Sequence, residues 1–173
     1  IGLETNSSQT NLGGVPKILD NKVFLFFDGD HNRLDAQIRE SVAQILLGVS
    51  INGSGIRNKV SGSMSIAIPE WFSSGLAFYA ANQWNAEIED VLRDGFESGK
   101  YRKIQFLQGD DAKYAGYSMW YYINRAFGRD AVKSIIYFTG VDKDCSIAIK
   151  QVTNQKFRKL NKQWAEYYRD KFG

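Results

Sequence analysis

The sequence contains very little cysteine, histidine or proline, and each shortage excludes a class of structure. A single cysteine, Cys145, excludes a disulfide within the chain, and a single histidine, His31, excludes a metal site built from several imidazoles. Two prolines in 173 residues leave room for long uninterrupted helices. No apolar run approaches the roughly 18 to 20 residues that a membrane-spanning helix needs, so no membrane insertion is expected.

The remaining composition is typical of one globular domain over residues 1–173. Hydrophobic residues make up 43% and charged residues 24% of the chain, close to the averages for compact domains. The 22 Lys and Arg against 19 Asp and Glu leave a net charge of +3. The basic residues Lys156, Arg158, Lys159 and Lys162 are interpreted as a solvated helix face, so no nucleic-acid partner is expected.

Hydrophobic spacing and capping signals predict a chain that is mostly helical. Pro69 is typical of a helix start and Asn85 of an N-cap, while Gly48, Gly128 and Gly140 are expected to end helices. The predicted helices comprise residues 34–47, a segment opened by Pro69, a segment between Asn85 and Gly99, and residues 111–127, 130–138, 142–152 and 155–172. Predicted loops comprise residues 1–15 and 49–63.

One segment, Lys22–Phe27, is predicted to be a strand, because a Lys is followed by five consecutive apolar residues. A single strand cannot satisfy its own backbone hydrogen bonds, so it needs partners. Either short strands lie at residues 15–20 and 64–68, or the natural domain begins before Ile1, and we favour the second alternative. The sequence also starts without a charged-then-apolar leader, so a processed chain or a fragment is expected.

Few residues match a known catalytic or metal-binding pattern. His31 follows Asp28-Gly29-Asp30, but the further carboxylates of a calcium loop are missing, so we interpret this turn as a helix cap. Cys145 is expected to be a small core residue. The sequence has no Gly-x-Ser-x-Gly elbow and no phosphate-binding glycine loop, and its spacing singles out no pair of carboxylates for glycoside hydrolysis.

Two segments together resemble a known family. Pro69–Tyr79 is similar to the motif Pro-x-Trp-Phe-x-Glu-Gly-x-Ala-Glu-Tyr, and Ile38–Gln44, about thirty residues earlier, takes the place of His-Glu-x-x-His. Tyr117–Ile123, followed by Phe127-Gly128, continues the likeness, which covers residues 15–140. These motifs resemble the peptidase MA-like family of gluzincin metallopeptidases. The segment from Gly13 to Asp30 extends the resemblance to large bacterial TolB-like envelope proteins, in which such a domain precedes a β-propeller.

The resemblance implies that the zinc site of the family has been lost. By position, its two zinc-binding histidines correspond to Arg39 and Ala43, its ligand Glu corresponds to Ser74, and only the general base, Glu40, is retained. Because a lone carboxylate cannot lower the pKa of water as zinc does, we expect no peptidase activity, no metal and no cofactor. The Arg39 guanidinium either occupies part of the space of the metal beside Glu40 or is a solvated side chain on the helix face.

Together these observations predict an α+β, predominantly α fold: a zincin-like helical domain with a small β-sheet, truncated at its N-terminus. The single domain would consist of the loop 1–15, the peptidase-like region 16–140 and the helices 141–173. The predicted function is that of a non-catalytic pseudo-peptidase domain, acting in protein interaction or scaffolding within a larger protein of the bacterial cell envelope, in the periplasm. Its partners would be other domains of the same polypeptide, such as a downstream β-propeller, or another envelope protein.

The candidate site is the inherited cleft of Arg39, Glu40, Ala43, Ser74 and Tyr117, the last as a cleft hydroxyl. Trp71 and Tyr121 are candidate binding residues, although aromatic residues at the start of a buried helix more often belong to the core. Two alternative functions remain open. One is a carbohydrate- or peptide-binding module that uses exposed aromatic rings, and the other is a hydrolase that uses Glu40 as general base without zinc.

Overall fold

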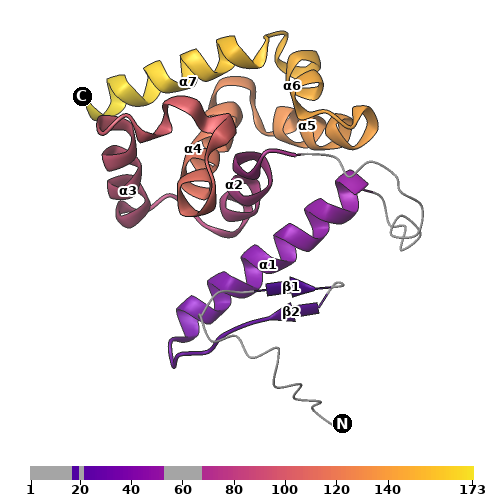
Figure 1. Ribbon diagram of the computed structural model, residues 1–173, viewed down its shortest axis with the longest axis vertical. Coiled ribbons are helices and arrows are strands. Elements are labelled where there is room, and N and C mark those ends of the chain that lie inside the picture. The colour runs from indigo at the N-terminus through magenta and orange to yellow at the C-terminus, as the bar shows by residue number, and fades with distance from the viewer. Residues whose placement is uncertain (1–16, 20–21, 53–67) are drawn as a thin grey trace.

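The computed structural model describes residues 17–19, 22–52 and 68–173, and these residues are predominantly helical, as predicted (Figure 1). Among them no helix is both long enough and apolar enough to cross a membrane. The elements are β1 (Lys17–Leu19), β2 (Lys22–Phe24), α1 (His31–Asn52), α2 (Glu70–Ala81), α3 (Ala86–Glu97), the 3₁₀ helix η3 (Lys100–Phe106), α4 (Gly109–Phe127), α5 (Arg129–Asp142), α6 (Cys145–Thr153) and α7 (Phe157–Phe172).

The two short strands form an antiparallel hairpin in which Ile18 lies opposite Val23. The strand predicted at residues 22–27 therefore ends at Phe24, and its partner is β1, within the chain. A partner strand within residues 15–20 was the first alternative, whereas a natural domain that begins before Ile1 stays a prediction. Apart from Ile68, the second suggested strand at residues 64–68 lies outside the described residues, as does the loop 1–15. A hairpin of three residues per strand is smaller than the sheet of a zincin-like domain, so that part of the fold stays a prediction.

The centre of the helical body is the crossing of α2 over α4 (Figure 1). Their backbones touch at Gly75 and Gly116, where a Cβ on Gly116 would overlap the carbonyl oxygen of Trp71. The Trp120 indole Nε1 donates a hydrogen bond to the Phe72 carbonyl oxygen at 3.0 Å across the same interface. Large aromatic side chains fill the surrounding core, notably Trp71, Phe72, Tyr117, Trp120, Trp164 and Tyr168.

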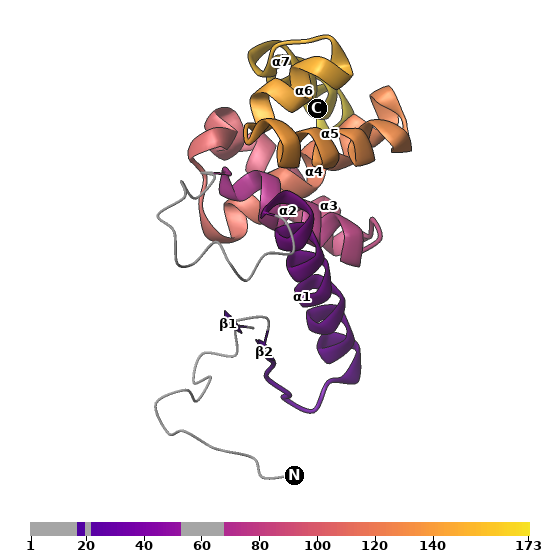
Figure 2. The same ribbon diagram turned by 90° about the vertical axis from the view of Figure 1, so that its right-hand side faces the viewer.

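The other helices surround this crossing, and α1 extends from it (Figures 1 and 2). The C-terminal end of α1 packs on α5, where a Cβ on Gly140 would lie 2.8 Å from the Ser50 carbonyl oxygen. Gly140 was predicted to end a helix. That prediction is wrong, because α5 continues to Asp142 and Gly140 lets it approach α1 closely. The helix end predicted at Gly48 is also wrong, because α1 continues to Asn52. The buried side chains of Leu47 and Ile51 stabilise this last part of the helix.

Several predicted caps are confirmed. The Asn85 Oδ1 accepts a hydrogen bond from the Ile88 backbone N–H at 2.9 Å, and Gly128 is the C-cap of α4. The Asp30 Oδ1 accepts from the Asn32 N–H at 2.9 Å, so the acidic turn before His31 is a helix cap, as interpreted. The 3₁₀ helix η3 was not predicted, because its 7 residues offer only one pair of buried apolar residues at helical spacing, Tyr101 and Ile104.

Candidate functional site

The two motif segments lie on helices that pack side by side. Arg39, Glu40 and Ala43 lie on α1, Ser74 lies on α2, and these two helices are in contact (Figure 1). Ala43 and Ser74 are both half-buried. The structure therefore brings together the elements that carry the predicted zinc-ligand positions.

The Arg39 side chain is engaged with the end of α2. Its Nε donates a hydrogen bond to the Ala81 carbonyl oxygen at 3.1 Å, and its guanidinium also pairs with Asp35 one turn earlier. A cation is favourable there because the carbonyl groups at a helix C-terminus carry partial negative charge. Ala81 lies seven residues after Ser74, about 10 Å along the helix axis. The Arg39 guanidinium thus holds the end of α2 in place.

Glu40 is half-buried, and the loss of water around its carboxyl raises its pKa above the usual value. The positive charge that opposes this rise comes from Lys113 on α4, while Asp110 adds to it. The Lys113 ammonium is 2.7 Å from the Asp110 carboxylate and lies over the Phe78 ring, 5.3 Å from its centroid. Glu40 therefore faces charges from α4 that the sequence analysis did not identify.

The predicted aromatic site residues belong to the packed interior. Tyr117 is buried with its ring against those of Phe78, Tyr79 and Trp84, and burial raises the pKa of its hydroxyl. Trp71 is 1% exposed and stacks on Phe157, so the core interpretation is the correct one for this residue. Neither residue is accessible to a ligand from solvent in this arrangement.

Tyr121 is half-buried with its ring 4.7 Å from that of Trp84. The most exposed aromatic rings among the described residues are Phe106 on η3 and Tyr137 on α5, which come from different elements. A row of coplanar exposed rings, as a sugar-binding surface requires, is therefore not seen in the described part of the chain.

The described residues contain no group of three or more His, Cys, Asp or Glu side chains placed to hold a metal ion. Cys145 is buried, and burial raises the pKa of its thiol to about 11. It is therefore a protonated, unreactive thiol at neutral pH, as expected of a core residue.

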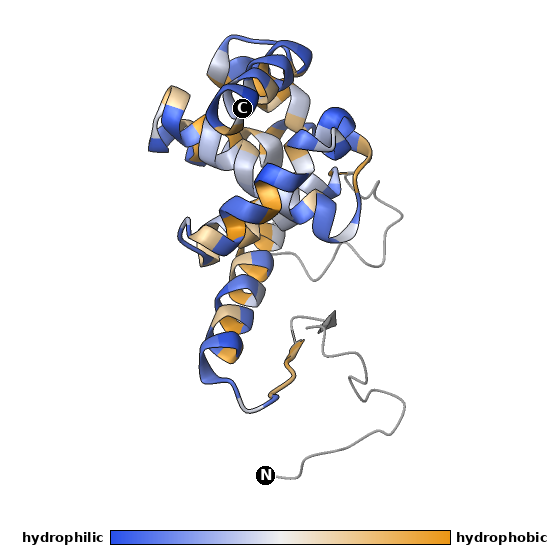
Figure 3. Ribbon diagram, turned by 90° about the vertical axis from the view of Figure 1, so that its left-hand side faces the viewer, coloured by the Kyte–Doolittle hydropathy of each residue, from blue (hydrophilic) through white to orange (hydrophobic). Residues whose placement is uncertain are grey.

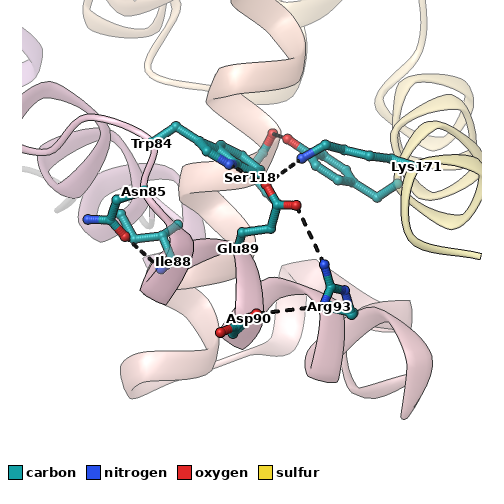
Figure 4. Close-up of polar contacts among 9 residues, drawn as sticks. Trp84, Asn85, Ile88, Glu89, Asp90, Arg93, Ser118 and Lys171 are labelled. Atoms are coloured by element: carbon teal, nitrogen blue, oxygen red, sulfur yellow. Dashed lines mark hydrogen bonds and ion pairs between the residues drawn. The ribbon is translucent and has the colours of Figure 1, made fainter.

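A polar cluster near the C-terminus also has a structural explanation. The Glu89 Oε2 accepts hydrogen bonds from the Trp84 Nε1 at 2.6 Å and from the Lys171 Nζ at 2.9 Å (Figure 4). The Lys171 ammonium also lies 4.1 Å from the centroid of the Trp84 indole. Because the members of this cluster satisfy one another, it ties α7 to α3 and leaves no free group for chemistry.

Within the described residues, α1 has an exposed apolar face, which we call the α1 face. It consists of Ile38, Val42, Leu46 and Val49, which are between 41% and 60% exposed. Their spacing places them along one side of the helix, and Figure 3 shows hydrophobic positions on the part of α1 that extends from the helical body. Hydrophobic spacing predicted the helix over residues 34–47 but did not separate this exposed side from the opposite, buried side of α1, which includes Leu47 and Ile51.

The hairpin lies beyond α1, away from the helical body (Figures 1 and 2). Just after the hairpin, the Phe26 backbone N–H donates a hydrogen bond to the Gln37 Oε1 of α1 at 3.4 Å, and the Arg33 guanidinium of α1 pairs with the Asp28 carboxylate at 2.6 Å. Phe26 and Phe27, which follow β2, are themselves exposed. Two more apolar side chains are therefore exposed just before α1.

Comparison with known proteins gives no match: no family model fits the chain, and no curated protein or solved structure is significantly similar to it.

Proposed function

We propose that this chain is a non-catalytic interaction domain, of peptidase MA-like descent, that docks a neighbouring domain of its own polypeptide in the bacterial cell envelope. The observation that carries the proposal is the exposed α1 face of Ile38, Val42, Leu46 and Val49. Contiguous apolar surface of this kind typically marks an interaction site. The occupant is an apolar surface of the next domain, because the face carries no charge that would select a charged partner.

The energy of such a contact is sufficient for docking within one polypeptide. Burying a fully exposed Leu, Val or Ile side chain contributes about 1.5–3 kcal/mol. The four side chains of the α1 face are roughly half exposed, so their complete burial would contribute about 1 kcal/mol each. Two domains joined by a linker need little more binding free energy than this, because the linker raises the effective concentration of each domain for the other.

The absence of catalysis is supported by the residues at the ligand positions. Arg39 is bound to the end of α2, and Ala43 has no side chain that could bind zinc. Glu40 alone could accept a proton, but without a metal it lacks the activated water that the gluzincin reaction requires. We therefore expect the isolated chain to show no peptidase activity with or without added zinc.

Side-chain footprinting tests the docking proposal. Hydroxyl radicals should label Leu46 strongly in the 173-residue chain and several-fold less in the full-length polypeptide, where the next domain covers it. Val42→Lys in the full-length polypeptide should restore labelling of Leu46, because a charge in the contact loosens it. Phe106→Lys, at an even more exposed apolar residue on η3, is the control and should leave Leu46 protected. Equal labelling of Leu46 in both forms would overturn the proposal.

One observation favours a second candidate, a hydrolase with Glu40 as general base. The raised pKa of this half-buried carboxyl would bring it closer to neutral pH, as a general base requires. A hydrolytic activity that Glu40→Gln abolishes, in a variant with unchanged thermal unfolding, would support this candidate over the interaction domain.

A further inference from the structure

A cavity opens between α3, η3 and α7, on elements that neither the α1 face nor the predicted cleft uses. Its volume is about 270 Å³, which is at the small end of ligand-binding cavities. Its lining includes four aromatic residues, Phe96, Tyr101, Trp164 and Phe172. A space of this size fits a ligand with an apolar body of one or two rings.

Two glycines build one wall of this cavity. A Cβ on Gly95 would overlap the Tyr101 ring, so the missing side chain lets that ring pack directly on α3. Gly99 has a φ of +71°, and a Cβ there would lie 2.8 Å from the Arg102 Nε. The chain therefore turns sharply after α3 and places the Arg102 guanidinium against the backbone at the rim.

Two guanidinium groups line the cavity, those of Arg102 and Arg169. Neither side chain forms an ion pair or a hydrogen bond with any residue that the structure describes. Neighbouring cations behave differently: Arg93 is 3.6 Å from both the Glu89 and the Asp90 carboxylates. The cavity thus has two cationic groups without protein partners beside an aromatic lining.

The surface next to the cavity is also basic. A second, more open depression along α7 shares Ala165 and Arg169 with the first. The two are lined by six cationic side chains, Lys156, Arg158, Lys159, Lys162, Arg102 and Arg169, and by two carboxylates, Glu97 and Glu166. These side chains together carry a charge of +4, so the side-chain potential around the cavity favours anions.

We infer that this cavity binds a small organic anion, with its aromatic or apolar body against Phe96 and Phe172 and its carboxylate or sulfonate between Arg102 and Arg169. Guanidinium groups suit this role because they present forked donors that match the oxygens of such an anion. A single-stranded nucleic acid is disfavoured, because Tyr101 and Trp164 are buried in the wall and offer no exposed ring faces for bases to stack on.

Two dyes that differ in one charged group test the inference. 1-Anilinonaphthalene-8-sulfonate is an aromatic anion, and N-phenyl-1-naphthylamine has the same rings without the sulfonate. Fluorescence titration of the chain should show at least tenfold tighter binding of the sulfonate dye. Equal affinities for the two dyes would overturn the inference, because the arginines would then contribute nothing.

Charge variants identify where the sulfonate dye binds. Arg102→Gln with Arg169→Gln should weaken binding of the sulfonate dye at least tenfold and leave the neutral dye unchanged. Arg33→Gln with Arg129→Gln removes the same charge elsewhere and is the matched control. Leu46→Gln on the α1 face should also have no effect. If Leu46→Gln or the control pair abolishes dye binding while the cavity variants do not, the cavity is not the site. Thermal unfolding of each variant confirms that it is folded.

Discussion

At the scale of single residues, two glycines determine how closely α2 and α4 approach. Gly116 lies against the Trp71 carbonyl oxygen and the Gly75 Cα, so a methyl group at Gly116 would collide with backbone atoms that cannot move independently. Gly116→Ala should therefore lower the free energy of unfolding by about 3 kcal/mol, as overpacking at a helix crossing does. Urea denaturation followed by circular dichroism would measure this change.

Gly48 provides the matched control, because a Cβ there would meet no atom within 4 Å. It lies inside α1, where glycine is an unfavourable helix residue. Gly48→Ala should therefore raise the free energy of unfolding by about 0.5–1 kcal/mol. A loss of stability in Gly48→Ala as large as that in Gly116→Ala would show that close packing at the α2–α4 crossing is not the cause.

Glu40 should make stability depend on pH. Because desolvation raises its pKa in the folded chain above the ordinary 4.5, the folded state binds more protons than the unfolded state in the window between the two values. The contribution of Glu40 is therefore most favourable below pH 4.5 and is lost as the pH rises through its folded pKa. Glu40→Gln should match the wild-type stability at pH 4 and exceed it at pH 7, in urea denaturation at each pH.

The Glu89 carboxyl provides a control of opposite sign. Its hydrogen bonds to Lys171 and Trp84 lower its pKa, so its contribution is present above pH 4.5 and is lost as the pH falls through its folded pKa. Glu89→Gln should therefore lose stability at pH 7 and approach the wild type in acid.

For Glu40 itself, the contradicting result is a difference in unfolding free energy between wild type and Glu40→Gln that stays the same from pH 4 to pH 7. That result would show that Glu40 is not desolvated in the folded chain.

At the scale of elements, local signals predicted helices well where they were sufficient. Asn85 caps α3 and Gly128 ends α4, because a side-chain acceptor and a positive φ act within one turn of the chain. The helix end predicted at Gly140 is wrong because the role of this residue is tertiary: it makes room for Ser50 on α1, and α5 continues through it. A glycine required for close packing and one required for a turn look the same in sequence.

The candidate site was harder to predict, for the same reason. The sequence placed Arg39 and Glu40 next to each other on one helix, but their partners come from elsewhere. Arg39 donates a hydrogen bond to the carbonyl oxygen of Ala81, 42 positions away, and the charge of Lys113 on α4 lowers the pKa of Glu40. The cavity beside α7 needs three elements, of which the short helix η3 was not predicted. Only contacts distant in sequence create these surroundings, and no spacing rule encodes them.

At the scale of the whole molecule, the decisive question is whether α1 and α2 keep the mutual placement of a zinc peptidase. They pack side by side, and residues four apart on α1, such as Arg39 and Ala43, share one face. If the placement is retained, Arg39→His, Ala43→His and Ser74→Glu together should create a zinc site, because three such ligands are enough for a catalytic-type centre.

The triple variant should then bind one zinc ion per chain, measured by metal analysis after dialysis. At a zinc concentration 100 times the dissociation constant, its free energy of unfolding should rise by about 2.7 kcal/mol, by mass action on the folded state. The double variant Arg39→His with Ala43→His tests the need for Ser74→Glu, and it should bind zinc at least tenfold more weakly. If zinc leaves the unfolding of the triple variant unchanged, the three positions do not converge. The likeness to the peptidase MA-like family would then be confined to the sequence, whereas the α1 face and the cavity at α7 would stand on their own geometry.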